Sequence, residues 1–267
     1  MAFVPSRDTA IVSALGLTQI IGYGTLYYSF SILAPHIAAD LAISLEEVFG
    51  YFSISLFIGG LSATVIGRQM DKIGAATVLT LGSVLSALTL ILCAWSPSVA
   101  VFAGGIVLLE VSSGMVQYQA AFAALVENDP KTASRNITYL TLIGGFASTI
   151  FWPISAALLD VLTWREIYVI FAVLNLLLCM PLHFWIMRQG KTIRANGIRQ
   201  AREHVVGAIP LEDRRKAMLT VSAAFAILGF TLASILAHMV PMLATLGLGS
   251  AAVVIGAYMA MNIGAKD

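Results

Sequence analysis

The chain has 267 residues, of which 59% are hydrophobic and 11% are charged, and its mean hydropathy is +0.90. Soluble domains carry about 25% charged residues, so this composition excludes an ordinary soluble protein and predicts one that crosses a membrane several times. The net charge of +1 gives no reason to expect nucleic acid as a partner, and two cysteines are too few for a disulfide framework.

Apolar segments recur through the whole chain. About 20 apolar residues are needed to cross the hydrocarbon core, and we expect these segments to form an all-α, polytopic helix bundle. The predicted spans cover residues 11–34, 47–67, 75–95, 99–126, 137–160, 165–187, 217–240 and 249–265. Pro35, Pro97 and Pro241 are predicted to mark helix ends. The first segment is long enough to be retained as a helix rather than cleaved as a signal peptide.

Lysine and arginine are distributed unequally between the two sides of this topology. With the amino terminus inside, Arg165 is the one residue of the 15 lysines and arginines that falls in an outer loop. Cytoplasmic loops carry an excess of these residues. We therefore expect a multi-pass protein of the inner or plasma membrane, embedded in the lipid bilayer with a cytoplasmic amino terminus.

The first predicted helix carries polar residues on one face. Gln19, Tyr23 and Tyr27 recur every four residues, which places them one above another. Such a face can form the wall of a substrate site that offers aromatic rings and hydroxyls. It can equally serve hydrogen bonding between helices, and the sequence leaves both interpretations open.

The second predicted helix has small residues at intervals of four, at Ser55, Gly59, Ala63 and Gly67. Small residues let two membrane helices approach closely, so this side of the helix is predicted to serve packing.

A short charged connection joins the second and third predicted helices. It reads Gly67-Arg-Gln-Met-Asp71-Lys72-Ile-Gly74. Gly67 is predicted to let its helix approach a neighbour, and Gly74 to form a tight turn with positive φ. Asp71 can accept hydrogen bonds from amides at a helix N-terminus, while Lys72 marks the connection as cytoplasmic.

The spacing G-x-x-x-D-K-x-G at this place resembles the signature loop between helices 2 and 3 of the major facilitator superfamily. The resemblance implies a transporter made of two six-helix halves that alternate access to a central site. It also implies that the loop contacts a helix of the second half and stabilises the outward-open state, with Asp71 as the critical acceptor. Gly67, Asp71, Lys72 and Gly74 would then set the conformational balance.

The fourth predicted helix places Glu110, Gly114, Gln117 and Tyr118 on one face. Glu110 stands near the middle of its apolar run, where a carboxylate costs about 2.5–3.5 kcal/mol by insertion scales. Protonation could offset this cost, as a proton-coupled carrier requires, and so could pairing with a cationic substrate or with an arginine of the second half. A neutral glutamic acid that fixes helix packing remains the alternative.

The fifth predicted helix carries a small and polar stripe that ends at Trp152-Pro153. Its members are Thr138, Thr141, Gly145, Ser148 and Trp152. Together with Trp164-Arg165 at the start of the next helix and Tyr118-Gln-Ala-Ala-Phe122, this pattern is similar to one bacterial branch of the superfamily. Asp160 and Arg165 could form an ion pair across the short outer loop.

Two histidines and two asparagines complete the set of candidates. His183 is predicted to lie at the membrane interface, and His238, at the outer end of the seventh helix, is a candidate for gating or substrate contact. Asn175 and Asn262 are predicted to bond neighbouring helices.

The predicted division is a six-helix half at 1–187, a basic cytoplasmic linker at 188–216 and two helices of a second half at 217–267. Because members of the superfamily usually have twelve helices, the resemblance implies a truncation after about eight. An inactive fragment, or a membrane-embedded interaction partner, is therefore the alternative to a transporter.

No Walker loop, nucleophile–base set or metal-ligand cluster is visible, so we expect neither an enzyme nor a cofactor or metal. The leading prediction is secondary transport of a small solute, coupled to protons, by alternating access. The predicted substrate-binding residues are Gln19, Tyr23, Tyr27, Glu110, Gln117, Tyr118, Trp152 and His238.

Overall fold

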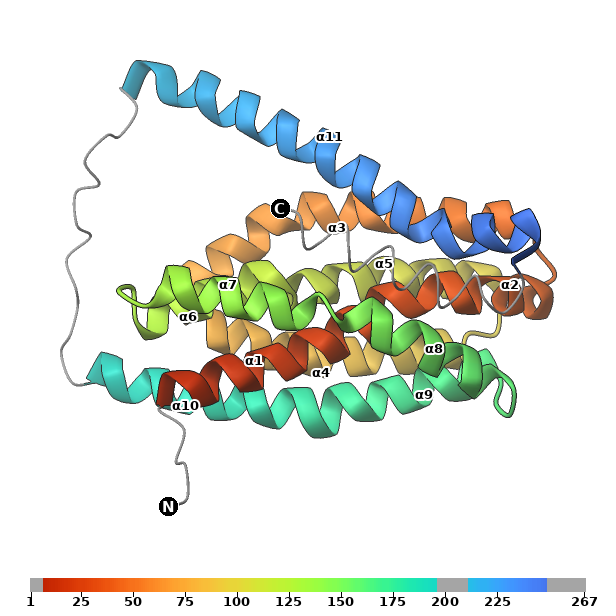
Figure 1. Ribbon diagram of the computed structural model, residues 1–267, viewed down its shortest axis with the longest axis horizontal. Coiled ribbons are helices and arrows are strands. Elements are labelled where there is room, and N and C mark those ends of the chain that lie inside the picture. Colours follow the sequence, from red (N-terminus) through yellow and green to blue (C-terminus); the bar gives the residue numbers. More distant parts are fainter. Residues whose placement is uncertain (1–6, 196–210, 249–267) are drawn as a thin grey trace.

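The computed structural model describes residues 7–195 and 211–248, and every element within these ranges is a helix (Figure 1). This confirms the predicted all-α bundle. In chain order the helices are α1 (Arg7–Tyr23), η1 (Gly24–Tyr28), α2 (Ser29–Leu41), α3 (Leu45–Ile73), α4 (Ala75–Ala94), α5 (Val99–Val116), α6 (Tyr118–Asn128), α7 (Ala133–Gly144), α8 (Ala147–Leu159), α9 (Trp164–Leu174), η2 (Asn175–Cys179), α10 (Met180–Ala195), α11 (Leu211–Leu243) and η3 (Ala244–Leu248). The elements written η are short π-helical turns.

Seven helical segments of the described chain are long and apolar enough to cross a membrane, and they agree with the first seven predicted spans to within several residues. They are Arg7–Leu41, Leu45–Ile73, Ala75–Ala94, Val99–Asn128, Ala133–Leu159, Trp164–Gly190 and Arg215–Leu232. The eighth predicted span, 249–265, lies outside the described residues, as does Asn262.

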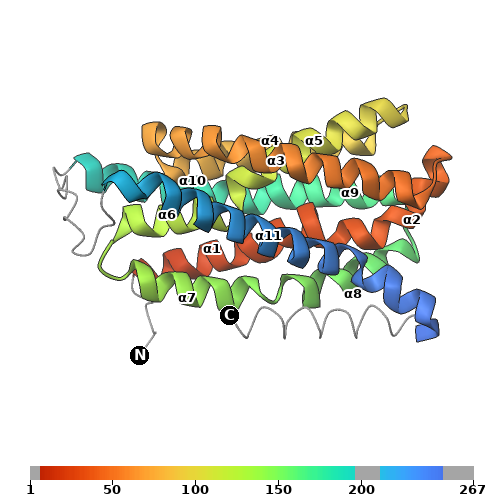
Figure 2. The ribbon, with the colours of Figure 1, turned by 90° about the horizontal axis from the view of Figure 1, so that it is seen from above.

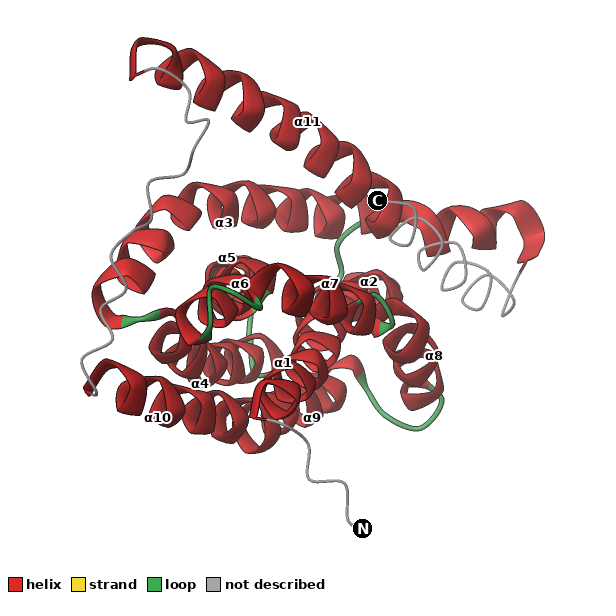
Figure 3. Cartoon of the chain, turned by 60° about the vertical axis from the view of Figure 1, so that its left-hand side comes forward, coloured by secondary structure: helices red, strands yellow, loops and turns green. Residues whose placement is uncertain are grey.

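The first six spans run back and forth along the long axis of the molecule (Figures 1 and 2). Helix α4 packs against α3, α5, α6, α9 and α10, which belong to the second, fourth and sixth spans, while the first span contacts the second, fourth, fifth, sixth and seventh. Helix α11 lies on the outer side of α3, so that α3 stands between α11 and most of the bundle, and it contacts α2 (Figure 3).

Two of the spans are broken near their middle. Between α5 and α6 the backbone of Gln117 is extended, with φ −81° and ψ −168°, and between α7 and α8 the helix is interrupted after Gly144 and Gly145. The prediction of one continuous fourth helix is therefore wrong after Gln117, although Glu110, Gly114 and Gln117 do line one cavity, as their predicted common face requires. Its amide still donates to the carbonyl of Ser113, and its carbonyl accepts from the amides of Ala120 and Ala121. The backbone amide and carbonyl of Gln117 are thus both hydrogen-bonded at the break, as the membrane interior requires.

Two of the three proline predictions are wrong. Helix α2 continues through Pro35 to Leu41, and α11 continues past Pro241 to Leu243. Proline is tolerated inside membrane helices because nearby hydroxyls and local adjustments compensate for the missing bond. Ser31, whose carbonyl Pro35 cannot bond, lies in a turn where its hydroxyl donates to the carbonyl of Tyr28 at 3.1 Å. Pro97 does stand in the connection between α4 and α5, as predicted.

The two ends of the bundle differ in charge. The Arg7 guanidinium donates to Asn128 Oδ1 at 3.4 Å and to the carbonyl of Gln189 at 3.3 Å, which joins the start of α1 to the ends of α6 and α10. The other described lysine and arginine side chains near this end are Arg68, Lys72, Lys131, Arg135, Arg188, Arg215 and Lys216.

Arg165 lies at the opposite end, and its expected pairing with Asp160 is wrong. Its guanidinium instead forms an ion pair with Asp40 at 2.8 Å and donates to the carbonyl of Ala94 at 2.7 Å. The Asp40 carboxylate also accepts a hydrogen bond from the indole of Trp164. This bond fixes the carboxylate at the end of the first span, where Arg165 pairs with it.

Candidate functional site

Four tyrosines from the first and fourth spans form a connected group, which we call the aromatic cluster: Tyr23, Tyr27, Tyr28 and Tyr118. The ring centroids of Tyr23 and Tyr118 are 4.8 Å apart, those of Tyr23 and Tyr28 are 6.2 Å apart, and those of Tyr27 and Tyr28 are 5.3 Å apart. All four side chains are partly buried. The structure thus brings together three of the predicted substrate residues and adds Tyr28.

A π-helical turn positions this cluster. In η1, the amide and the hydroxyl of Ser29 both donate to the carbonyl of Gly24. The wide turn projects Tyr27 and Tyr28 side by side, and such turns inside α-helices are frequent at functional sites. Gly24 is required here because a Cβ at this position would overlap the ring of Phe151 on α8.

Trp152, another predicted substrate residue, supports the cluster from α8. It is fully buried, its indole Nε1 donates to the carbonyl of Tyr28 at 2.8 Å, and its ring meets that of Tyr28 edge-on at 5.8 Å. These contacts give Trp152 a packing role against the first span, whatever else it contacts.

Tyr118 begins α6 directly after the break at Gln117. Its ring stacks on Phe122 at 5.1 Å, and its hydroxyl donates to the carbonyl of Thr141 at 3.3 Å, next to the interruption between α7 and α8. Tyr118 therefore contacts both broken spans and the first span.

Glu110 faces a different neighbour, the second span. Its side chain is 7% exposed, and a Cβ built at Gly59 on α3 would lie 3.2 Å from the Glu110 Cβ. A cavity of about 260 Å³ opens between α3 and α5 beside this contact, and both Glu110 and Gln117 line it. Of the small residues of α3, Ser55 is buried and Gly59 packs closely against Glu110. Ala63 and Gly67, further along the helix, line the cavity together with Gly59.

Buried polar atoms without partners gather in this region. Glu110 Oε1, Gln117 Nε2 and Gln19 Oε1 have no hydrogen-bond partner among the described residues, although Gln19 Nε2 donates to the carbonyl of Val116 at 2.8 Å. Ser113, on the same helix as Glu110, has an unpartnered hydroxyl as well. Buried polar atoms are nearly always bonded, so this concentration indicates a place where water or a ligand binds. Tyr27 lies within electrostatic range of Glu110, which connects the region to the aromatic cluster.

His238 is not brought into this region. Its side chain is exposed on α11, and its ring lies 4.7 Å from that of Phe49 near the start of α3. Its role in gating stays a prediction.

The loop at 67–74 differs from expectation in two respects. Gly74 has φ 91° as predicted, but a Cβ at Gly67 would meet nothing within 4 Å among the described residues, so the expected close approach is not made within this part of the chain. Asp71 and Lys72 are exposed. The acceptor at the N-terminus of α4 is Glu127, whose two carboxylate oxygens lie 3.0 and 3.2 Å from the amide nitrogen of Ala75.

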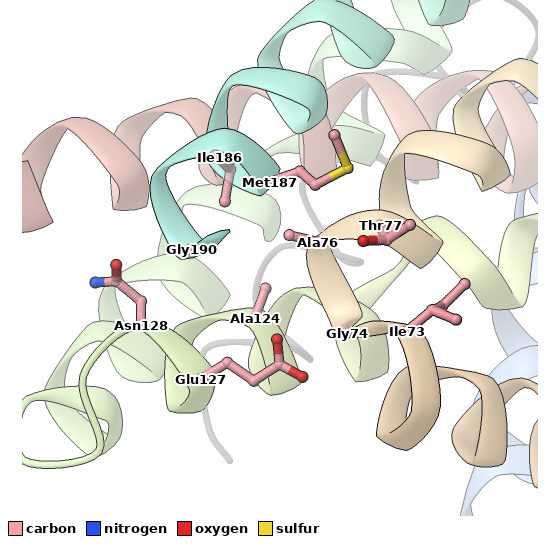
Figure 4. A pocket seen from close by; sticks show the side chains of 10 residues that line it. All are labelled: Ile73, Gly74, Ala76, Thr77, Ala124, Glu127, Asn128, Ile186, Met187 and Gly190. Carbon is pink, nitrogen blue, oxygen red and sulfur yellow. The ribbon is translucent and has the colours of Figure 1, made fainter. Parts of the chain in front are cut away.

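Sequence reasoning missed Glu127, which follows the fourth apolar segment directly. Figure 4 shows it reaching from α6 toward Gly74 beside a cavity of about 60 Å³ that Asn128 and Gly190 also line. Its position at the end of a predicted span was an available signal, because a carboxylate there can cap a neighbouring helix.

His183, which was predicted to lie at the membrane interface, is buried inside the bundle, where it is 1% exposed. Its Nδ1 lies 2.7 Å from the hydroxyl of Ser83, and its Nε2 lies 2.9 Å from that of Thr18. Asn175 bonds neighbouring helices as predicted, since its amide donates to the hydroxyl of Thr25 at 2.9 Å.

Comparison with known proteins supplies one match. Residues 15–265 match the family model described as Major Facilitator Superfamily, which covers nearly the whole chain. A search of curated proteins gives no match.

Proposed function

Because the chain belongs to the Major Facilitator Superfamily and is thus a membrane transporter of that type, we propose that it moves a small solute by proton-coupled secondary transport. In this proposal two halves alternate access to a site near the membrane centre. Gln19, Tyr23, Tyr27, Glu110, Gln117 and Tyr118 contribute this half's share of the site, Trp152 supports it, and His238 acts at the gate.

The observation that carries the proposal is the environment of Glu110. It is the only aspartate, glutamate, lysine or arginine buried among the described side chains, it lines a cavity, and its Oε1 has no partner there. A carboxyl in the middle of a span costs about 2.5–3.5 kcal/mol and marks function by default. A group that exchanges a proton for a substrate contact during each cycle explains why such a cost is retained.

Three backbone irregularities provide places where the spans can bend. They are the π-turn η1, the extended Gln117 and the interruption after Gly145. The aromatic cluster touches all three regions: Tyr27 lies in η1, Tyr118 follows Gln117, and the Tyr118 hydroxyl donates to the carbonyl of Thr141 near the third. We propose that these spans change shape as the site opens, which is compatible with their satisfied backbone hydrogen bonds.

We further propose that the basic end of the bundle is cytoplasmic, in an inner or plasma membrane, because positively charged residues favour that side. The first half then comprises 1–187 and the connector 188–216. The described helices enter the connector from both sides, since α10 extends to Ala195 and α11 begins at Leu211. Gly67, Asp71, Lys72 and Gly74 lie at this end, where they can bias the conformational balance.

The test uses the purified full chain in vesicles that contain a pH-sensitive dye. A panel of cationic, anionic and neutral solutes is added, and proton movement is recorded beside uptake of each labelled solute. We expect at least one solute to drive proton movement, with Glu110→Gln abolishing it and the exposed control Glu46→Gln leaving it intact. Equal proton movement in Glu110→Gln would contradict the role of Glu110. Solute uptake without proton movement would contradict the coupling alone.

A further inference from the structure

The cavity between α3 and α5 has one charged group and a defined shape. Of the residues that line it, Glu110 alone carries a charge, and the others are apolar, glycine or glutamine. No lysine, arginine or histidine is among them. The described basic side chains instead lie near the two ends of the bundle. An anionic ligand would therefore meet a carboxylate in a medium of low dielectric constant with no cation to offset it.

Two polar atoms in the wall are free to bind a ligand. Glu110 is more than nine-tenths buried. Its Oε1 has no hydrogen-bond partner among the described residues, and Gln117 Nε2 has none there either. Gln117 directly follows the end of α5 and stands seven positions after Glu110, which corresponds to about 10 Å along a helix axis. A ligand that satisfies both needs polar groups at its two ends.

Apart from the exposed Gln119, the remaining wall is apolar and includes several glycines. Gly60 and Gly67 line the cavity, and a Cβ at either position would meet nothing within 4 Å among the described residues. At about 260 Å³ the cavity is slightly below the usual range of about 300–1,000 Å³ for ligand pockets. It suits a molecule of about one aromatic ring with a short side chain.

From this geometry we infer that the cavity is a binding site for a small organic ammonium ion that carries a hydroxyl at its far end. The ammonium pairs with Glu110, the hydroxyl bonds Gln117, and the apolar body lies against the glycines of α3. A hydroxyl both donates and accepts, so it satisfies Gln117 with either orientation of the amide. This inference rests on the proposed transport function and names the class of its substrate.

Equilibrium binding to the full chain in lipid nanodiscs tests it, with radiolabelled tyramine as the probe and empty nanodiscs as background. Three competitors each change one feature of tyramine. 4-Propylphenol replaces the ammonium by a methyl group, 3-(4-hydroxyphenyl)propanoate replaces it by an anion, and 2-phenylethylammonium lacks the hydroxyl. We expect saturable tyramine binding, with the neutral and anionic competitors at least tenfold weaker and 2-phenylethylammonium severalfold weaker.

Four variants assign the binding to this cavity. Glu110→Gln should weaken tyramine binding at least tenfold. Gly60→Leu should do the same, because its Cβ would meet nothing within 4 Å among the described residues and its side chain would occupy the cavity. Gly50→Leu is the matched control, because Gly50 lies on the same helix with open space around it but does not line the cavity. Gln117→Met should reduce tyramine to the affinity of 2-phenylethylammonium.

The inference is overturned if tyramine shows no saturable binding, or if 4-propylphenol or 3-(4-hydroxyphenyl)propanoate binds as tightly as tyramine. It is also overturned if Glu110→Gln or Gly60→Leu binds tyramine as tightly as the wild type does. Vesicle transport of a solute that is not an ammonium ion, together with absent tyramine binding, would remove the substrate class and leave the transporter proposal standing. Tyramine binding in a chain that transports nothing would leave the site and remove the transporter proposal.

Discussion

The carboxylate of Glu127 is predicted to hold the start of α4, although Asp71 is the residue that the sequence offers as an acceptor for amides at a helix N-terminus. Glu127 accepts from the amide of Ala75 at 3.0 and 3.2 Å, whereas Asp71 is exposed and makes no hydrogen bond or ion pair within the described residues. Losing a capping side chain costs about 0.5–2 kcal/mol, and the charge adds about 0.3–1 kcal/mol through the helix dipole. Because Glu127 is exposed, solvent screening keeps the sum near about 1–2 kcal/mol.

Amide hydrogen exchange measures this effect locally. A loss of about 1–2 kcal/mol corresponds to exchange about 5–30-fold faster, and we expect that increase in a peptide spanning residues 71–78 of Glu127→Ala. Glu127→Gln should lie between Ala and wild type, because its amide oxygen still accepts without charge. Asp71→Asn is the control and should leave the exchange unchanged. If Asp71→Asn accelerates exchange and Glu127→Ala does not, the assignment of the cap to Glu127 is wrong.

Two packing predictions follow from the cluster and its support. Trp152→Phe keeps a ring but removes the indole donor from the carbonyl of Tyr28, which still accepts from the Ser31 hydroxyl, so it should lower the free energy of unfolding by about 0.5–1.5 kcal/mol. Trp95→Phe, at a side chain that is 74% exposed, should change it little. Unfolding in mixed micelles followed by circular dichroism compares the two variants. Gly24→Ala forces a methyl group into a phenylalanine ring of α8 and should lower the free energy of unfolding by about 1–3 kcal/mol. The control Gly22→Ala should be tolerated, because the added methyl group meets nothing within 4 Å among the described residues. The folded fraction on size-exclusion chromatography distinguishes the two variants, and equal folded fractions would refute the steric argument.

The spans could be predicted because a hydrophobic run of about 20 residues has one stable arrangement in a bilayer. The breaks could not. Glutamine has an ordinary helix propensity, so Gln117 gives no signal of a break. Glycine is frequent in continuous membrane helices, so Gly144 and Gly145 give none either. What decides the local backbone is contact with other spans, such as Tyr118 against Tyr23 and against the carbonyl of Thr141. Such contacts join positions about 20 to 95 residues apart in the chain and leave no periodic signal.

The candidate site could be predicted only in part, because contacts between spans leave no signal in the sequence. Helical spacing correctly stacked Gln19, Tyr23 and Tyr27 on one side of the first span, but it could not tell which neighbour each would meet. Gln19 bonds the backbone of α5, while Tyr23 meets Tyr118. Glu110 was identified from its depth alone, and the cavity beside it depends on how α3 crosses α5.

His183 shows why a buried polar group can be invisible in sequence and still be determined by chemistry. Each of its two partners can also donate to a backbone carbonyl, Ser83 to that of Leu79 at 3.0 Å and Thr18 to that of Leu15 at 2.9 Å. A hydroxyl has one hydrogen, and a neutral imidazole donates once and accepts once. With His183 neutral, one hydroxyl must therefore turn its hydrogen away from its carbonyl toward the ring, whereas a protonated ring would let both keep their carbonyls. Three spans thus share one hydrogen-bond network, and no single span contains enough of it to be recognised in the sequence.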